Sequence, residues 1–280
     1  MEHEYKVYMV TGATDGIGKA TAELLARTGA AVLLHGRDRN KCEAVARELS
    51  RRTGNRKLRC YVADYRSLAE VERAAESIAS CEPRLDVLIN NAGIGSGKLS
   101  DKVRKLSGDG HELRLAVNYL APYLLTRRLV PLLRSSAPAR IVNVASVGQK
   151  QIALDNLMLE NKYDPFEAYK QSKLALILFT FELAERLKPA GVTVNCLHPG
   201  SLLNAKMVRE SLPFAFGSAK SGAECVAHLA LSPGLSGVTG RYYDQKTEAR
   251  AHPQAYDRRF RQLLWSVTAK LTGLSDDDEA

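Results

Sequence analysis

A single-domain, doubly wound parallel sheet with helices on both faces is the α/β fold class that this sequence predicts. Short, β-branched apolar runs alternate with longer segments of helical period, which is typical of repeated strand-helix units. No Pro/Gly/Ser-rich linker separates the two halves of the chain. A glycine-rich stretch joins the first run to the first helical segment, where such folds place a tight turn.

The apolar runs predict about seven strands. In chain order these cover residues 6–10, 31–35, 58–63, 85–89, 140–144, 192–197 and 240–243. The segments of helical period between and after them cover residues 18–28, 39–51, 67–80, 110–134, 165–188 and 255–272. We expect one domain over residues 1–274, followed by a solvated acidic tail at 275–280.

Composition excludes several classes of protein. With 45% hydrophobic and 25% charged residues among 280, the chain is neither disordered nor fibrous. Its net charge of +9 favours an anionic partner, such as a phosphorylated cofactor, nucleic acid or an acidic membrane surface. The five cysteines lack zinc-ligand spacing, so neither a metal site nor a disulfide framework is indicated. Without a signal peptide or a long apolar span, we expect a soluble, cytoplasmic protein.

The glycine-rich stretch reads TGATDGIG at residues 11–18. Glycines let the backbone turn tightly and approach a pyrophosphate, which free N–H groups and the positive end of the next helix then hold. This pattern predicts a dinucleotide-binding Rossmann fold, and a glycine turn that serves packing only is the alternative. The cofactor-binding candidates here are Gly12, Thr14, Asp15, Gly16, Ile17 and Gly18.

The end of the second strand favours NADP(H) over NAD(H). Folds that bind NAD commonly place an acidic residue there to hold the ribose hydroxyls. This chain has Gly36 at that position, followed by Arg37, whose guanidinium can form a fork on a 2′-phosphate. A solvated Arg37 is the alternative, and Asp38 leaves some use of NAD open.

Two further strand ends carry cofactor candidates. Asn91, Ala92 and Gly93 follow the fourth strand, where small residues let the chain pass close to a flat ligand. Asp64 ends the third strand and is a candidate for the adenine amino group. The alternative for Asp64 is an N-cap of the helix that begins near Ser67.

The catalytic candidates are Asn118, Ser146, Tyr169 and Lys173. Tyr169 and Lys173 are four residues apart in a helical segment, so both side chains leave one face. An ammonium about 4 Å from a phenol contributes on the order of 4 kcal/mol, enough to lower the phenol pKa from about 10 to near 7. Tyr242 and Lys246 share this spacing but follow the last strand, so we expect them to be structural.

The ordered set of motifs resembles the short-chain dehydrogenase/reductase family. It comprises TGATDGIG at 11–18, NNAG at 90–93, Asn118, Ser146, YKQSK at 169–173 and HPG at 198–200. The resemblance implies that Tyr169 is the general acid/base and that Ser146 positions the carbonyl group. It also implies that Lys173 binds the nicotinamide ribose and lowers the pKa of the tyrosine.

The same resemblance implies further roles and an assembly. Asn118 would hold a water of the proton relay, and Pro199 and Gly200 would border the nicotinamide. Helices corresponding to 118–134 and 165–188 commonly pair across a dimer in this family, so we expect a homodimer or homotetramer.

Within the family the chain looks most like the retinol dehydrogenase-like branch. This likeness rests on HGRDRNK at 35–41, the long Ser146-to-Tyr169 interval, AYKQSKLALILFTFELAERL at 168–187 and RQLLWSVTAKLTG at 261–273. Members that act on retinoids usually carry an N-terminal membrane anchor, which we do not find here. Asn204 replaces a threonine that commonly meets the nicotinamide amide.

Two segments bear on the substrate. The loop at about 201–218 carries apolar residues that predict an apolar substrate wall, with ordinary core packing as the alternative. The C-terminal helix has apolar residues on one face beside arginines, which is typical of helices that touch a membrane or cap a pocket. Packing on the body of the protein is the commoner use of such a helix.

These observations predict an NADP(H)-dependent oxidoreductase that exchanges hydride with the carbonyl or alcohol carbon of a small, mostly apolar substrate. One alternative is a catalytically idle NADP-binding regulatory or scaffold protein, although the complete Asn-Ser-Tyr-Lys set argues against it. Another is a short-chain reductase of a different substrate class, acting on acyl thioesters, steroids or sugars. A nucleic-acid partner has no recognisable binding module to support it.

Overall fold

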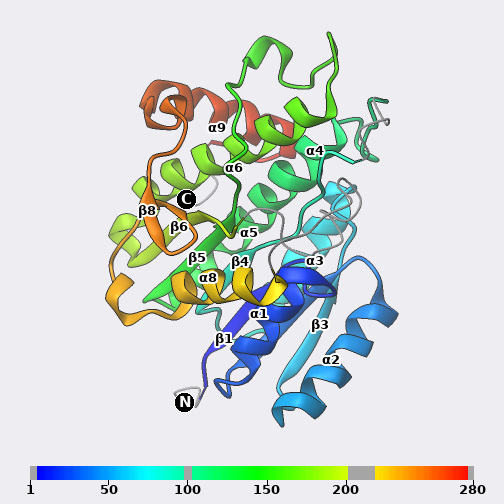
Figure 1. The fold of residues 1–280 in the computed structure, drawn as a ribbon, viewed down its shortest axis with the longest axis vertical. Helices are drawn as coiled ribbons and strands as arrows, with labels where there is room; N and C mark the ends of the chain where they lie inside the picture. The colour runs from blue at the N-terminus through cyan, green and yellow to red at the C-terminus, as the bar shows by residue number, and fades with distance from the viewer. Residues whose placement is uncertain (1–4, 98–102, 201–217, 277–280) are drawn as a thin grey trace.

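A mostly parallel sheet forms the centre of the molecule (Figure 1). The structure is a computed structural model that describes residues 5–97, 103–200 and 218–276. In these residues the sheet has eight strands in the order β3-β2-β1-β4-β5-β6-β7-β8, and only β8 is antiparallel to its neighbour. The strands are β1 Val7–Val10, β2 Ala31–Gly36, β3 Leu58–Val62, β4 Val87–Asn90, β5 Ala139–Val144, β6 Val192–His198, β7 Tyr242–Asp244 and β8 Thr247–Ala249.

Helices follow the strands and begin where polar side chains cap them. The α-helices are α1 Gly16–Ala26, α2 Arg39–Thr53, α3 Leu68–Cys81, α4 Leu113–Leu115, α5 Ala121–Ser135, α6 Pro165–Leu187, α8 Ala219–Leu231 and α9 Arg258–Thr272. A π-helical turn, η1 (Ala116–Leu120), joins α4 to α5, and 3₁₀ turns lie at η2 Leu154–Asn156, η3 Lys188–Ala190, η4 Pro233–Leu235 and η5 Pro253–Tyr256. The side chains of Asp15, Asp38, Ser67 and Asp164 accept N–H groups of the first turns that follow them.

The two faces of the sheet are covered by separate layers of helices. Side chains along β2 alternate between the two cores, with Leu33 on one face and Leu34 on the other. One core includes side chains of α3, α5, α6 and α9, and the other includes side chains of α1, α2 and α8. The doubly wound parallel fold that the sequence predicts is therefore confirmed, with one more strand than expected.

The additional strand is the edge strand β8, which forms a hairpin with β7. Its three residues, Thr247–Ala249, are short and mostly exposed, so they give no apolar alternation from which a strand could be predicted. Gln245 in the hairpin turn has a φ of 56°. Tyr242 lies in β7 and Lys246 in this turn, so their four-residue spacing does not place them on one helix.

The C-terminal helix α9 packs on α6 (Figure 1). Its Trp265 is 2% exposed, and the guanidinium carbons of Arg186 and Arg127 lie 4.1 and 4.5 Å from the tryptophan ring centroid. The rings of Tyr123 and Phe179 lie 5.2 and 5.9 Å from the same ring. Packing on the body of the protein is thus what the structure shows for this helix. Helix α9 covers part of the surface of α5 and α6, the two helices that the family resemblance expects to pair across a dimer.

No helix in the described ranges combines the length and the apolar character needed to cross a bilayer.

Replacing Trp265 with alanine should lower the free energy of unfolding by about 3–5 kcal/mol, because it empties the space between α5, α6 and α9. Urea unfolding monitored by circular dichroism measures this loss. Leu263→Ala is the matched control on the same helix, since Leu263 is 48% exposed and its truncation should change stability by no more than about 0.5 kcal/mol. Equal losses in the two variants would contradict the packing role of Trp265.

Candidate active site

The predicted site residues gather at one edge of the sheet, where the parallel strands end. This edge is where open α/β sheets bind ligands. Residues that follow β1, β2, β3, β4, β5 and β6 meet there, and the predicted members are Gly12, Arg37, Asp64, Asn91, Ser146 and Pro199. Gly200 follows Pro199 with a φ of 119°. The loop at 201–218, including Asn204, lies outside the described residues except for Ser218.

Helix α6 supplies Tyr169 and Lys173. The carboxylate of Asp164 accepts the N–H groups of Phe166 and Glu167 at 2.8 and 3.0 Å, which caps the start of the helix. Tyr169 and Lys173 follow one turn apart, so both face the end of β5. The predicted helical relation of these two residues is confirmed.

Ser146 lies directly beyond the end of β5 and is held on several sides. Its Oγ accepts the N–H of Gly148 at 3.0 Å and shares a hydrogen bond with Tyr169. Its carbonyl oxygen accepts the Gln149 side-chain amide at 3.2 Å and the Tyr242 hydroxyl at 3.3 Å. The tyrosine that the sequence identifies as structural thus supports the backbone of the candidate serine.

The structure corrects the predicted electrostatics of Tyr169 and Lys173. The Lys173 ammonium lies 6.0 Å from the centroid of the Tyr169 ring and donates to the Val144 carbonyl at 2.8 Å. Burial raises the pKa of Tyr169, and the hydrogen bond with Ser146 opposes this rise only in part. Burial lowers the pKa of Lys173 to about 8. The expectation that the ammonium brings the phenol pKa near 7 is therefore wrong.

Asn118 is fully buried in the π-helical turn η1, a type of turn frequent at functional sites. Its Oδ1 accepts the Ile94 N–H at 2.8 Å, and its Nδ2 donates to the Ile94 carbonyl and the Ser172 hydroxyl at 3.0 Å each. Ser172 in turn donates to the Tyr169 carbonyl at 2.7 Å. Because both amide protons of Asn118 are engaged, its side chain joins the loop after β4 to α6.

The glycine turn sits against the end of β4. Gly12 has a φ of 65°, and a Cβ there would lie 2.9 Å from the Cα of Ala92. A Cβ on Gly18 would lie 2.2 Å from the Gly12 carbonyl oxygen, so only glycine fits. The Thr11 hydroxyl accepts the N–H groups of Asn91 and Ala92 at 2.9 Å each, which binds the two strand ends together.

Gly93 brings the cofactor candidates to the catalytic candidates. A Cβ at this position would lie 3.1 Å from Asn118 Oδ1 and 3.5 Å from the Lys173 ammonium. The backbone that follows β4 therefore passes directly beside two of the predicted catalytic residues.

A buried histidine that the sequence did not single out also holds the glycine turn. The Nδ1 atom of His35 accepts the Gly12 N–H at 3.3 Å, and its Nε2 lies 3.1 Å from the Ala63 carbonyl oxygen. Burial lowers the pKa of His35 to about 4, so the ring is neutral at physiological pH and keeps its acceptor nitrogen. Its place beside the Gly36-Arg37 pair at the end of β2 was the available signal.

Two predicted cofactor residues lie farther out on this edge. Arg37 is exposed, and in the described part of the chain it has no hydrogen-bond partner, only a longer-range electrostatic interaction with Asp64. Burial alone would raise the pKa of Asp64, but hydrogen bonds from Arg66 outweigh it and hold that pKa below its ordinary value. Ser67 caps α3, so the alternative role of Asp64 as the helix cap is wrong.

The described residues contain no cluster of histidine, cysteine and acidic side chains that could hold a metal ion.

Comparisons with known proteins identify the family of the chain. The family model described as short chain dehydrogenase matches residues 6–214. Retinol dehydrogenase 13 of Mus musculus is 37% identical over 287 residues, covering 96% of this chain and 84% of the relative. The structure of a 3-ketoacyl-(acyl-carrier-protein) reductase of Brucella melitensis, complexed with NADH, is similar to this one, with a TM-score of 0.69 and 27% sequence identity. The match covers 85% of this chain and 96% of the reductase chain. RhlG of Pseudomonas aeruginosa, in an active-site complex with NADP, has a TM-score of 0.69 at 28% identity, with coverages of 85% and 93%. The chain therefore belongs to the short-chain dehydrogenase family of oxidoreductases, in its retinol dehydrogenase-like branch.

Proposed function

We propose that this protein is an NADP(H)-dependent oxidoreductase acting on the carbonyl or alcohol carbon of a small, mostly apolar substrate. The observation that carries the proposal is that Gly93, at the end of the dinucleotide-binding half, passes beside Lys173 and Asn118. One edge of the sheet thus joins a dinucleotide turn to a hydroxyl pair suited to proton transfer, Ser146 and Tyr169.

Tyr169, Ser146 and Lys173 have different roles in the proposed proton transfer. Tyr169 gives a proton to the carbonyl oxygen in reduction and takes it back in oxidation. Ser146 donates a hydrogen bond to the same oxygen and so holds it against the phenol. Lys173 keeps a positive charge within the buried site, which favours the tyrosinate form of Tyr169 as the proton leaves. The water-holding role of Asn118 stays a prediction.

The residues at the strand ends fit a nicotinamide dinucleotide. The N–H groups in the first turn of α1, including those of Ile17 and Gly18, have no intrahelical acceptors and suit a pyrophosphate. Lys173 and Gly93 would hold the nicotinamide end, and we assign Pro199, Gly200 and Asp64 to the same cofactor. When bound, the nicotinamide supplies or accepts the hydride.

The preference for NADP(H) rests on Gly36 and Arg37. A Cβ at position 36 would lie 2.6 Å from Cγ2 of Thr14, so an acidic side chain there would require the Thr14 side chain to shift. The exposed Arg37 guanidinium is free of hydrogen bonds among the described residues and can meet a 2′-phosphate. The similar structures include one complexed with NADH and one with NADP.

The apolar substrate class is inferred from the likeness to retinol dehydrogenase 13. Its support within the described residues is Val147, which follows Ser146 and is 51% exposed. The single domain over 1–274, the cytoplasmic location and the homodimer or homotetramer stay predictions, as does membrane contact by the C-terminal helix.

Tyr169→Phe should lower turnover by about 10²–10⁴-fold, because it removes the proton donor, and should leave NADPH affinity intact. Steady-state assays with apolar aldehydes and ketones, together with NADPH fluorescence titration, measure both quantities. Tyr256→Phe is the matched control at a half-exposed tyrosine outside the site. Unchanged turnover in Tyr169→Phe would show that the acid/base assignment is wrong.

Arg37→Ala should weaken NADPH binding by about 10- to 100-fold, the value of a charged hydrogen bond, and should leave NADH binding unchanged. Fluorescence titration with each cofactor gives the two dissociation constants. Arg47→Ala removes the same charge from an exposed position farther along α2 and should affect neither. An equal loss for NADPH and NADH in Arg37→Ala would remove the basis for the NADP preference.

Carbonyl reduction should be nearly independent of pH below about 7 and should fall as the pH rises through about 8. Lys173 is charged below its lowered pKa of about 8 and loses its proton above it, whereas Tyr169, whose pKa is raised, keeps its proton over this range. The pH dependence of kcat/KM from pH 6 to 10 tests this prediction, because kcat/KM reports the ionisations of the free protein. A rate that stays constant to pH 10 would contradict the electrostatic role of Lys173.

A further inference from the structure

A buried arginine outside the predicted catalytic set, Arg114, lies beside the loop that follows β4. Arg114 precedes Asn118 by four residues on the α4–η1 segment, and its side chain is 8% exposed. Its Nε donates to the Gly95 carbonyl at 3.0 Å, and its Nη2 donates to the Ser96 carbonyl. Asn118 holds Ile94 and Arg114 holds the next two residues, so one segment fixes three consecutive residues of this loop.

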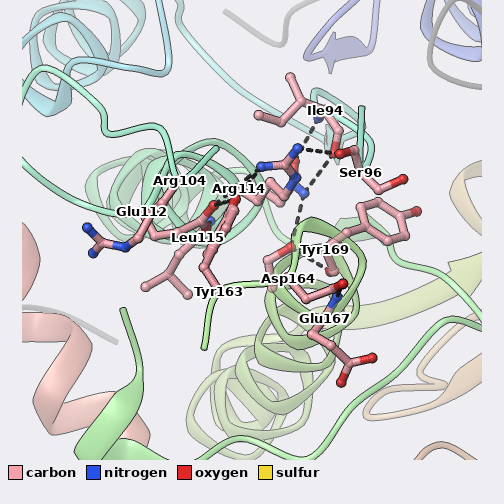
Figure 2. A network of polar contacts seen from close by, with 12 residues as sticks. Ile94, Ser96, Arg104, Glu112, Arg114, Leu115, Tyr163, Asp164, Glu167 and Tyr169 are labelled. Carbon is pink, nitrogen blue, oxygen red and sulfur yellow. Dashed lines mark hydrogen bonds and ion pairs between the residues drawn. The ribbon is translucent and has the colours of Figure 1, made fainter. Parts of the chain in front are cut away.

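The same guanidinium reaches the segment that leads into α6. Its Nη1 donates to the Tyr163 hydroxyl at 2.6 Å, and Tyr163 donates to Glu112 Oε1 at 2.9 Å. Burial raises the pKa of Tyr163, so the phenol stays protonated and can accept from Arg114 while donating to Glu112. Figure 2 shows this network together with Asp164, which caps α6, and Tyr169, which lies within α6.

Glu112 completes the network and neutralises the buried charge. Its side chain is 1% exposed, lies 3.5 Å from Arg114 Nη1 and accepts the Leu115 N–H at 2.7 Å through Oε2. A buried ion pair contributes little net stability even when it is fully hydrogen-bonded. We therefore expect the Arg114–Glu112 pair to hold the neighbouring segments in one geometry. An arginine is needed here, because its planar guanidinium donates at once to two carbonyls of the loop after β4 and to the Tyr163 hydroxyl before α6.

We propose that Arg114 is a positioning residue for the substrate: with Tyr163 it clamps the Ile94–Gly97 loop to the start of α6 and so forms one fixed wall of the reaction site. The loop continues directly from Gly93, which passes beside Lys173. Gly97 has a φ of 81°, and a Cβ there would lie 3.3 Å from Arg114 Nη2, so the loop backbone turns closely around the guanidinium. This inference rests on the proposed function, since it takes the carbonyl substrate to sit against this wall.

Two variants loosen the clamp in different ways. Arg114→Lys keeps the positive charge beside Glu112 but cannot reach both carbonyls and the phenol. Tyr163→Phe keeps the ion pair and removes only the bridging hydroxyl. Arg128→Lys is the matched control, because Arg128 on α5 forms an ion pair with Glu72 on α3 and is 40% exposed.

The test combines steady-state kinetics with hydrogen exchange of the NADPH-bound protein. Both clamp variants should raise KM for the carbonyl substrate by about ten-fold or more, with the NADPH dissociation constant and the pH profile unchanged, because only the wall has moved. Amide exchange should become faster in residues 93–97 and 160–166, and the control should match the wild-type protein. Tyr163→Phe decides the question alone if Arg114→Lys does not fold.

An unchanged KM and unchanged exchange in a folded clamp variant would overturn the proposal. So would a fall in the unfolding temperature with no change in KM, which would assign the network to stability alone. If the wild-type protein turns over no carbonyl compound, the proposed function fails, and hydrogen exchange still decides whether the clamp exists.

Discussion

The contact between the glycine turn and the end of β4 is the constraint on which the rest of the site depends. Gly18 fits against the Gly12 carbonyl only because it has no Cβ, and Thr11 binds the amides that follow β4. With these strand ends joined, the Gly93 backbone passes beside Lys173, whose ammonium lies 3.5 Å from where a Cβ on Gly93 would be. A side chain at Gly12 or Gly18 would push the glycine turn away from the end of β4. The dinucleotide-binding residues would then no longer lie beside the proton-transfer residues.

Burial sets the chemistry at the far end of that edge. The same removal from water raises the pKa of Tyr169 and lowers that of Lys173, so both groups are driven toward their neutral forms. Lys173 meets part of this cost by donating to the Val144 carbonyl. The site therefore keeps the phenol protonated, which is the form that a proton donor in carbonyl reduction needs.

Local patterns in the sequence predicted most of the fold and the identities of the candidate catalytic residues. Strands with apolar alternation and long capped helices can be recognised because their neighbours in sequence determine them. β8 and the His35 and Arg114 contacts could not be predicted, since each depends on segments far apart in the chain. The four-residue spacing placed Tyr169 and Lys173 on one helix face, but it could not reveal that a strand carbonyl would hold the ammonium.

The decisive experiment is isotope transfer from NADPH that carries deuterium in both C4 positions of the reduced nicotinamide, because only one of the two C4 hydrogens is transferred. The purified protein would be incubated with this cofactor and an apolar aldehyde or ketone, including retinal, and the alcohol would be analysed by mass spectrometry. We expect an alcohol one mass unit heavier, with the deuterium on the former carbonyl carbon. Alcohol formed without deuterium, or no alcohol from any of these carbonyl compounds while NADPH binds, would contradict this expectation.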